Sequence, residues 1–437
     1  MLRPLLAVTL VALGACSEPD PPRQHVVLVL VDQLRADVTE AWMPKTRALA
    51  QDGVVLSHMR AAAPWTYPSV TSLLSGLYPQ QHGADASPDG KELSRISPEV
   101  PLLPRTLRAA GYHTAAFVTN PFLHDWNVPF QSAFDHCDDS FIGDQGARRG
   151  HPELVWTERM YANTVNAHVR EYFDARPLAG PEFTYVHYID VHGRKEGDSR
   201  WQDAPFLPGY ENAVRYVDER IAELHAYFHA RYGGALVFVV TSDHGQNLGD
   251  DLALGEGQPW RQKKASLHDF NLRIPFFVLP GDSVPRGLVL DEGCSNIDVT
   301  PTLLAWLGVP GHADVPGVSL LGLLHGEPAA ATRPLYARHS TDHRLEEALL
   351  VGERKLVRYE KVAGKPVERS CCFDLAADPR EAVDLGCSAA ELEELLRVAG
   401  AAGRIYPATF AAPDEGTRAT LDDLGYGGES SAEEEHK

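Results

Sequence analysis

The sequence has few cysteines, no long internal apolar run and a shortage of positive charge. None of its six cysteines is spaced as C-x-x-C, and an odd number remains beyond Cys16, so neither a zinc cluster nor a disulfide framework is implied. No internal stretch is apolar for long enough to span a bilayer. The 40 Lys and Arg residues face 60 Asp and Glu residues, a net charge of −20, which argues against nucleic acid as a partner.

The first fifteen residues form a separate segment. The stretch "MLRPLLAVTLVALGAC" has one arginine, an apolar run and small residues before Cys16, which is typical of a secretory signal. "LGAC" followed by serine is similar to the bacterial lipobox, in which the cysteine is lipidated. We therefore predict a lipoprotein signal over 1–15, a Pro-rich linker over 16–25, and an exported protein anchored to the membrane through Cys16, in the periplasm or at the cell surface. A signal peptide with a coincidental cysteine is the alternative.

Along the rest of the chain, short apolar runs alternate with longer amphipathic ones, a pattern typical of α/β folds. Buried strands are predicted for "VVLVLVD", "TAAFVT", "FTYVHYID", "ALVFVVTSD" and "IPFFVLPG". Apolar residues at helical spacing predict a helix over "NAVRYVDERIAELHAYFHARYG", ending at Gly233. We expect a mixed or parallel sheet with helices on both faces.

The chain divides into three parts after the linker. Residues 26–330 carry the α/β pattern and are predicted to form the main domain. From about Pro334 the pattern changes to one that favours a small antiparallel sheet and a terminal helix, so a smaller C-terminal α+β subdomain is predicted over 331–410. Residues 411–437, which end in "GGESSAEEEHK", are predicted to be an acidic, disordered tail.

Three of the predicted strands end in acidic residues, Asp32, Asp190 and Asp243. Ligands of open α/β sheets bind beyond the carboxyl ends of the strands, so these carboxylates are expected to converge there. The alternative is that each acid caps the turn that follows it. Three acids in equivalent places favour a shared site.

Seven segments, taken together, resemble the sulfatase family within the alkaline phosphatase superfamily. In the order of that family they are "VVLVLVDQLRAD", "PWTYPSVTSLLSGLYPQQHG", "YVHYIDVH", "VVTSDHG", "KASLHDFNLRIPFFV", "IDVTPTLLAWLGVPG" and "FDLAADPREAVDL". The resemblance covers nearly all of the predicted mature chain. It implies an alkaline-phosphatase-like fold, with residues 26–330 as the catalytic domain.

The resemblance also implies a metal site. The family's ligand positions fall on Asp32, Gln33, Thr66, Asp243 and His244. Hydrolysis of a sulfate or phosphate ester needs a divalent ion, a nucleophile and a proton donor for the leaving oxygen. Two carboxylates, an imidazole and a neutral oxygen suit one divalent ion, and Ca²⁺, Mg²⁺, Mn²⁺ and Zn²⁺ all remain open. The two-metal phosphodiesterases need an Asp-x-x-x-His pair, but the fourth residue after Asp190 is Arg194.

The nucleophile position departs from the family pattern. Most sulfatases have a cysteine there that is converted to formylglycine, whereas this chain has Thr66, which cannot be converted. The arginine of the motif is replaced by Val70, and the lysine that supports formylglycine is replaced by Thr119. We interpret Thr66 as a metal-activated nucleophile that forms a covalent intermediate, as in phosphodiesterases of the superfamily. The alternative is that Thr66 only caps a helix that begins near Pro68.

Further residues are assigned by the same resemblance. Lys264 falls at the position of a lysine that contacts the transferred group. His192 falls on a histidine that contacts substrate and protonates the leaving group, although the usual Pro-Tyr continuation is missing. Trp65 and Tyr67 are expected either to line a leaving-group pocket or to pack in the core. His268, which replaces a common tyrosine, is given no role.

The sequence therefore predicts a metal-dependent hydrolase of small-molecule or glycan sulfate or phosphate esters, with catalytic Thr66, His192 and Lys264. Two alternatives remain. The first is a transferase that passes a phospho-head-group to a surface glycan or lipid. The second is a family member that binds glycans without catalytic activity. The loss of the arginine and the lysine supports this alternative.

Overall fold

The computed structural model describes residues 23–85, 93–123, 128–142, 161–192, 209–250, 266–328, 332–340, 344–362, 365–400 and 405–411. The predicted signal peptide, most of the linker, Lys264 and nearly all of the predicted acidic tail lie outside these ranges. Predictions for those segments remain predictions.

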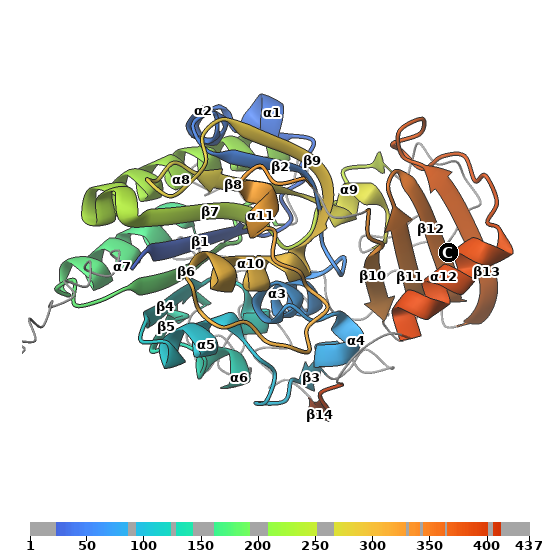
Figure 1. The fold of residues 1–437 in the computed structure, drawn as a ribbon, viewed down its shortest axis with the longest axis horizontal. Coiled ribbons are helices and arrows are strands. Elements are labelled where there is room, and N and C mark those ends of the chain that lie inside the picture. The colour runs from blue at the N-terminus through green and yellow to red at the C-terminus, as the bar shows by residue number, and fades with distance from the viewer. Residues whose placement is uncertain are drawn as a thin grey trace, which may run out of the picture.

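A large mixed sheet forms the centre of the main domain (Figure 1). Its eight strands run in the order β5-β4-β6-β1-β7-β8-β2-β9. Their bounds are β1 His25–Val31, β2 Val54–Arg60, β4 His113–Val118, β5 His136–Asp138, β6 Glu182–Tyr188, β7 Leu236–Ser242, β8 Arg273–Leu279 and β9 Leu288–Ser295. All neighbours pair in parallel except β8, which is antiparallel to both β7 and β2. The five predicted strands are confirmed as β1, β4, β6, β7 and β8.

Helices cover both faces of this sheet, as the α/β pattern predicts. The α-helices are α1 Thr39–Trp42, α2 Pro44–Ala50, α3 Thr66–Ser75, α4 Pro79–His82, α5 Leu103–Ala109, α6 Val128–Gln131, α7 Ala162–Asp174, α8 Tyr210–Tyr232, α9 Asp269–Leu272, α10 Val299–Trp306, α11 Leu321–Leu324 and α12 Ala389–Gly400. The predicted helix is confirmed as α8, and Gly233 follows it with a φ of 58°.

The two faces of β1 explain why its run is apolar throughout. Successive side chains of a strand point to opposite faces. Val26, Leu28 and Leu30 belong to the core that contains residues of α3, α5 and α10, whereas Val27 and Val29 belong to the core of α7 and α8. Because both faces are buried, every residue of β1 is buried, and alternation of polar and apolar residues is absent.

The C-terminal subdomain is a separate antiparallel sheet in the order β10-β11-β12-β13, with α12 against it (Figure 1). Its strands are β10 Leu335–Ser340, β11 Arg344–Val351, β12 Arg354–Val362 and β13 Lys365–Asp374. Leu395 of α12 is buried in a cluster with Tyr336 and with Ala62, which precedes α3. A further pair, β3 Leu93–Arg95 and β14 Thr409–Ala411, brings the end of the described chain back to the main domain. The observed architecture confirms the predicted fold class.

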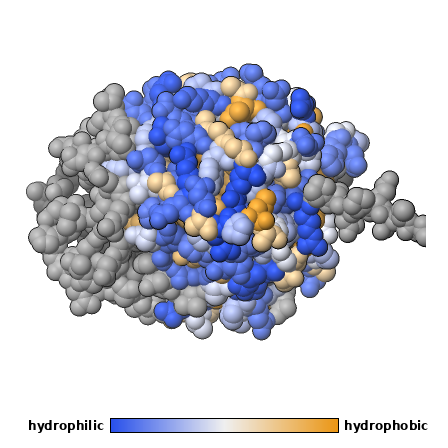
Figure 2. Space-filling view, turned by 90° about the vertical axis from the view of Figure 1, so that its left-hand side faces the viewer, coloured by the Kyte–Doolittle hydropathy of each residue, from blue (hydrophilic) through white to orange (hydrophobic). Residues whose placement is uncertain are grey.

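The face at the left of Figure 1 is mostly hydrophilic, with scattered apolar residues (Figure 2). Of the helices that the structure describes, none is both long enough and apolar enough to cross a bilayer.

One disulfide joins Cys372 of β13 to Cys387, which precedes α12. The sequence left this pairing open. A crosslink that spans 15 residues restricts the unfolded chain, and a loop of this length corresponds to about 3 kcal/mol. We expect replacement of both cysteines by alanine to lower the free energy of unfolding by about that amount, measured by chemical denaturation. A reductant should destabilise the wild type but not the double variant; equal sensitivity would contradict the assignment.

Candidate active site

The carboxyl ends of β1 and β7 meet at one edge of the central sheet. The two strands are parallel neighbours, and their last residues, Val31 and Ser242, pair in register. Asp32 and Asp243 each follow the strand end directly, so the register brings two carboxylates together that are 211 positions apart in the sequence. The prediction that acids converge here is confirmed for these two residues.

Asp32, Asp243 and His244 form a buried cluster that could hold a metal ion. One ligand atom from each residue lies within 4.8 Å of the other two. Within the described part of the chain, Asp32 Oδ1, Asp243 Oδ2 and His244 Nε2 are buried without a hydrogen-bond partner. Asp243 Oδ2 and His244 Nε2 lie 3.5 Å apart. Buried polar atoms are normally hydrogen-bonded, so three acceptors without such a bond, on residues whose ligand atoms lie this close, fit a cation. Two carboxylate oxygens and an imidazole nitrogen suit a divalent ion.

The other atoms of Asp243 and His244 fix the direction of these ligands. Asp243 Oδ1 accepts hydrogen bonds from the backbone N–H groups of Gln33 at 3.0 Å and His244 at 2.8 Å. His244 Nδ1 lies 2.8 Å from the carbonyl oxygen of Gly245, which makes Nδ1 the donor and leaves Nε2 as an acceptor. Such outer contacts are typical of metal ligands.

The two carboxylates have opposite pKa shifts. Burial disfavours the charge of Asp32, but His192, His187 and His244 together lower its pKa to about 2. Burial and the neighbouring Asp32 raise the pKa of Asp243. Two adjacent buried carboxylates repel one another, so the cluster is electrostatically costly until a cation compensates it.

Gln33, predicted as a ligand, lies at the edge of this cluster. It is one of two non-glycine residues in the described chain with positive φ, at 59°. A left-handed backbone costs energy for a side chain of this kind and is common at functional sites. The turn directs the N–H groups of Gln33 and Leu34 to Asp243 Oδ1 and Ser242 Oγ. Ligation by the Gln33 side chain remains a prediction.

Thr66 lies next to the cluster at the start of α3. It is the first helical residue and Trp65 holds the N-cap position, so the helix begins two residues before Pro68, where the capping alternative placed its start. Thr66 is fully buried, and its hydroxyl donates to Asp32 Oδ2 at 3.3 Å. The hydroxyl therefore contacts the carboxylate whose other oxygen belongs to the metal cluster.

All ten residues of α3 are buried, and polar contacts attach the helix to the site. Ser69 Oγ donates to the carbonyl oxygen of Asp243 at 2.6 Å, and Asn296 Nδ2 donates to Ser69 Oγ at 2.9 Å. Near the other end, His82 Nε2 lies 2.9 Å from Ser72 Oγ, and burial lowers the pKa of His82 to about 3. The position of Thr66 thus depends on buried hydrogen bonds to three separate segments.

Sequence reasoning missed two residues that contact Asp32. Asn120 Nδ2 donates to Asp32 Oδ2 at 2.6 Å, and His187 Nε2 lies 3.2 Å from the same oxygen. Tyr185 Oη lies 2.9 Å from His187 Nδ1. Thr119 donates to the carbonyl oxygen of His187 at 2.7 Å instead of facing the cluster. For His187 the available signal was a histidine near the carboxyl end of a fully buried strand.

The remaining predicted residues have different outcomes. His192 is buried and lies close enough to Asp32 to lower its pKa. Asp190 does not join the described metal cluster; its Oδ1 accepts from the backbone N–H of Ala162 at the start of α7, a helix that precedes it in the chain, and not from the turn that follows it. Tyr67 packs in the core and donates to the carbonyl oxygen of Ser94, as the packing alternative states. Lys264 lies outside the described residues.

Comparison with known proteins gives a consistent result. Residues 24–309 match the family model described as Sulfatase. An arylsulfatase of Clostridium perfringens (strain 13 / Type A) is 21% identical over 452 aligned residues, which cover 83% of this chain and 90% of the relative.

Solved structures share the fold at low sequence identity. A protein in complex with its substrate D-glucosamine-2-N,6-O-disulfate has a TM-score of 0.67 at 15% identity, covering 86% of this chain and 96% of that one. The phosphonate monoester hydrolase of Silicibacter pomeroyi has a TM-score of 0.62 at 19% identity, covering 86% and 94%.

Proposed function

The chain belongs to the sulfatase family, a family of sulfuric ester hydrolases within the alkaline phosphatase superfamily, and from this premise we propose a metal-dependent hydrolase of sulfate or phosphate esters with Thr66 as its nucleophile. The observation that carries the proposal is the hydrogen bond from Thr66 to Asp32, whose other oxygen faces Asp243 and His244. A nucleophile beside a cation site is the arrangement that ester transfer requires.

Asp32, Asp243 and His244 would hold the divalent ion through the three atoms that lack hydrogen-bond partners. When bound, the ion supplies positive charge that neutralises a nonbridging ester oxygen and lowers the pKa of the Thr66 hydroxyl. Asn120 and His187 occupy the second oxygen of Asp32, which leaves the first directed at the cluster. The first turn of α3 adds a helix dipole that favours negative charge on Thr66.

The reaction then follows in two balanced steps. Thr66 Oγ releases its proton to solvent and forms a bond to the sulfur or phosphorus, while the bond to the leaving oxygen breaks. His192 gives a proton to that leaving oxygen and so becomes the base for the second step. Water attacks the ester on Thr66, His192 takes a proton from the water, and the Thr66 oxygen takes up a proton from solvent as sulfate or phosphate leaves.

The identity of the nucleophile bears on the ester. A formylglycine hydrate releases sulfate by elimination, whereas an ester on threonine must be hydrolysed at the central atom. This requirement favours phosphoester chemistry, even though the relatives are named as sulfatases. A transferase would use the same first step and replace water by an acceptor hydroxyl, whereas a glycan-binding member would keep the pocket without turnover.

The test is hydrolysis of matched p-nitrophenyl sulfate, phosphate and phosphodiester by metal-stripped protein to which Ca²⁺, Mg²⁺, Mn²⁺ or Zn²⁺ is added singly. We expect metal-dependent release of p-nitrophenol, faster from phosphoesters than from the sulfate. Turnover that increases with added glycan or lipid acceptor would favour the transferase. Tight binding without turnover on any ester would favour the glycan-binding alternative.

We further propose that the enzyme is exported and anchored by a lipid on Cys16, which the "LGAC" segment supports. The anchor would keep the enzyme close to surface glycans or lipids. Cys16→Ala should release the protein from the membrane fraction without altering its specific activity.

A further inference from the structure

Five charged or titratable side chains are buried where the main domain meets the C-terminal subdomain. They belong to Arg60, His268, Asp269, Lys355 and Glu381, and none of these residues is more than 9% exposed. Charged residues are almost never buried to this degree unless they are paired. Figure 1 shows α9, which contains Asp269, between the large sheet and the strands of the subdomain.

Glu381 connects the two parts. It lies in the loop between β13 and α12 and has a φ of 56°, the second positive value among the described non-glycine residues. Its Oε2 accepts the backbone N–H of Asp269 at 2.6 Å and lies 3.1 Å from His268 Nδ1. Its Oε1 lies 2.7 Å from Lys355 Nζ, which comes from β12. One carboxylate therefore joins the small sheet to the start of α9.

The helix α9 contacts both halves of the active site. On one side, the backbone N–H of Gly245 donates to the carbonyl oxygen of Asn271 at 2.7 Å, and Gly245 directly follows the ligand His244. A Cβ on Gly245 would lie 2.0 Å from the carbonyl oxygen of Phe270, so α9 and this loop are in close contact.

On the other side, α9 contacts the segment that leads to the nucleophile. The backbone N–H of Ala61 donates to the carbonyl oxygen of Leu272 at 2.8 Å. Arg60, the residue before it, pairs with Asp269 through Nε at 2.8 Å and Nη2 at 3.1 Å. Thr66 follows five residues after Ala61, so α9 is hydrogen-bonded both to the residue after the metal ligand His244 and to the segment that leads to the nucleophile.

We propose that Glu381 is a positioning residue of the active site: by holding α9 from the C-terminal subdomain, it sets the distance between His244 and the turn that carries Thr66. The subdomain is then part of the catalytic apparatus, although none of its described residues belongs to the metal cluster. The expected change in ester turnover rests on the proposed function. The expected change in hydrogen exchange does not.

The physical chemistry favours a role in alignment over one in stability. Buried ion pairs contribute little net stability compared with apolar packing, because both charges lose their hydration. A buried ion pair is nevertheless compatible with only one arrangement of its partners, because each charge must lie against the opposite charge that compensates it. Burial opposes the charge of Glu381, yet Lys355 and His268 lower its pKa to about 2, so the bridge stays charged.

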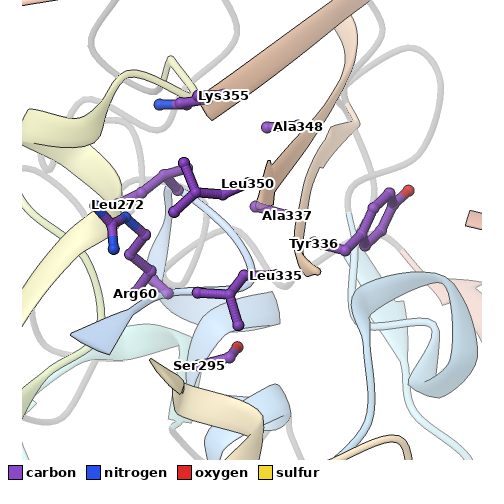
Figure 3. Close-up of a pocket in the computed structure, with 10 residues that line it drawn as sticks. Arg60, Leu272, Ser295, Leu335, Tyr336, Ala337, Ala348, Leu350 and Lys355 are labelled. Carbon is purple, nitrogen blue, oxygen red and sulfur yellow. The ribbon is translucent and has the colours of Figure 1, made fainter. Parts of the chain in front are cut away.

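The packing around the bridge leaves little freedom. Figure 3 shows Arg60 beside Leu272 and Lys355 pointing toward the same segment, around a cavity of about 10 Å³. This volume is at the lower limit for a single water molecule. Small displacements of the subdomain are therefore transmitted to α9 instead of being absorbed by solvent.

The test removes the bridge without leaving a buried charge. The double variant Lys355→Met/Glu381→Ala is compared with Arg358→Met/Glu347→Gln, which removes an ion pair of the same small sheet and keeps an acceptor for the Tyr336 hydroxyl. Hydrogen exchange is measured on peptides that contain Gly245 and Ala61, whose N–H groups donate to α9. We expect exchange about tenfold faster at both amides in the first variant and no change in the control.

Kinetics provide the second readout. With the best ester, kcat should fall about tenfold in the first variant while KM changes little, because the bridge aligns reacting groups and does not bind substrate. Glu381→Gln, which retains an acceptor for the N–H of Asp269, is a milder variant and should give an intermediate loss.

The outcomes separate this inference from the proposed function. Equal exchange at Gly245 and Ala61 in the bridge variant and the control would overturn the positioning role, whatever the activity. If the bridge variant does not fold, exchange at Gly245 and Ala61 is compared between Glu381→Gln and the control instead. Faster exchange with no ester turnover in the wild type would sustain the structural link and reject the hydrolase.

Discussion

Thr66→Ala is expected to lower kcat by roughly 10⁴-fold or more, as loss of a nucleophile does in other covalent enzymes. The hydroxyl that contacts Asp32 Oδ2 at 3.3 Å is the atom proposed to attack the ester, and alanine has no substitute for it. The protein should remain folded, because the change deletes two heavy atoms at one end of α3 and typical losses for such changes are about 1–2 kcal/mol. Initial rates with the best ester and a thermal unfolding curve are the measurements.

Thr66→Ser is the matched control, because it keeps the hydroxyl and removes only a methyl group. It should retain most of the activity and form the same covalent intermediate, which intact-protein mass spectrometry after rapid quenching would detect on residue 66. Undiminished turnover by folded Thr66→Ala would refute the nucleophile assignment.

Asp243→Asn is expected to weaken binding of the divalent ion by at least about 100-fold, which is beyond the loss typical for an outer-shell partner. Asparagine keeps an oxygen for the N–H groups of Gln33 and His244, so the turn should be preserved. It replaces Oδ2, the oxygen that faces the cluster, with an amide group. Calorimetric titration of metal-stripped protein with Mn²⁺ or Ca²⁺ measures the change, and activity should fall with it.

The same substitution should stabilise the metal-free protein. Burial and Asp32 raise the pKa of Asp243, so the wild type contains two buried carboxylates that repel one another without a cation. Asp243→Asn removes this repulsion, and its melting temperature without metal should exceed that of the wild type and no longer rise when metal is added.

Asp190→Asn is the control for this prediction. It makes the same change in a buried acid near a neighbouring strand end, but this acid accepts the N–H of Ala162, the first residue of α7. It should leave the affinity for the ion unchanged. A loss of affinity equal to that of Asp243→Asn would show that the three acids act together after all.

Local patterns in the sequence were sufficient to predict the strands, the long helix and the order of the family segments. Strands buried on both faces are continuous apolar runs, so β1, β4, β6, β7 and β8 were recognisable without any knowledge of their pairing. Strand β2 and the edge strand β9 carry mixed burial and were not predicted. Asp32, Asp243 and His244 could be found because each follows a strand end within a family motif.

Such local patterns do not show which distant segments of the chain lie next to one another. Both β6 and β7 pair with β1, but Asp243 follows the last residue of β7 directly, whereas Asp190 lies two residues beyond the end of β6 and accepts the N–H of Ala162. Likewise, Asn120 and His187 meet Asp32 because β4, β6 and β1 are adjacent in the sheet.

Short motifs and local periodicity are enough to identify the family, the α/β character and the residues most suited to hold a divalent ion. The tertiary structure decided which of those residues meet, which partners orient them and how Glu381 reaches α9 from another subdomain. Contacts of this kind join segments that are distant in the sequence, 112 positions in the case of Glu381 and Asp269, and they exist only once strand order, register and domain packing are set.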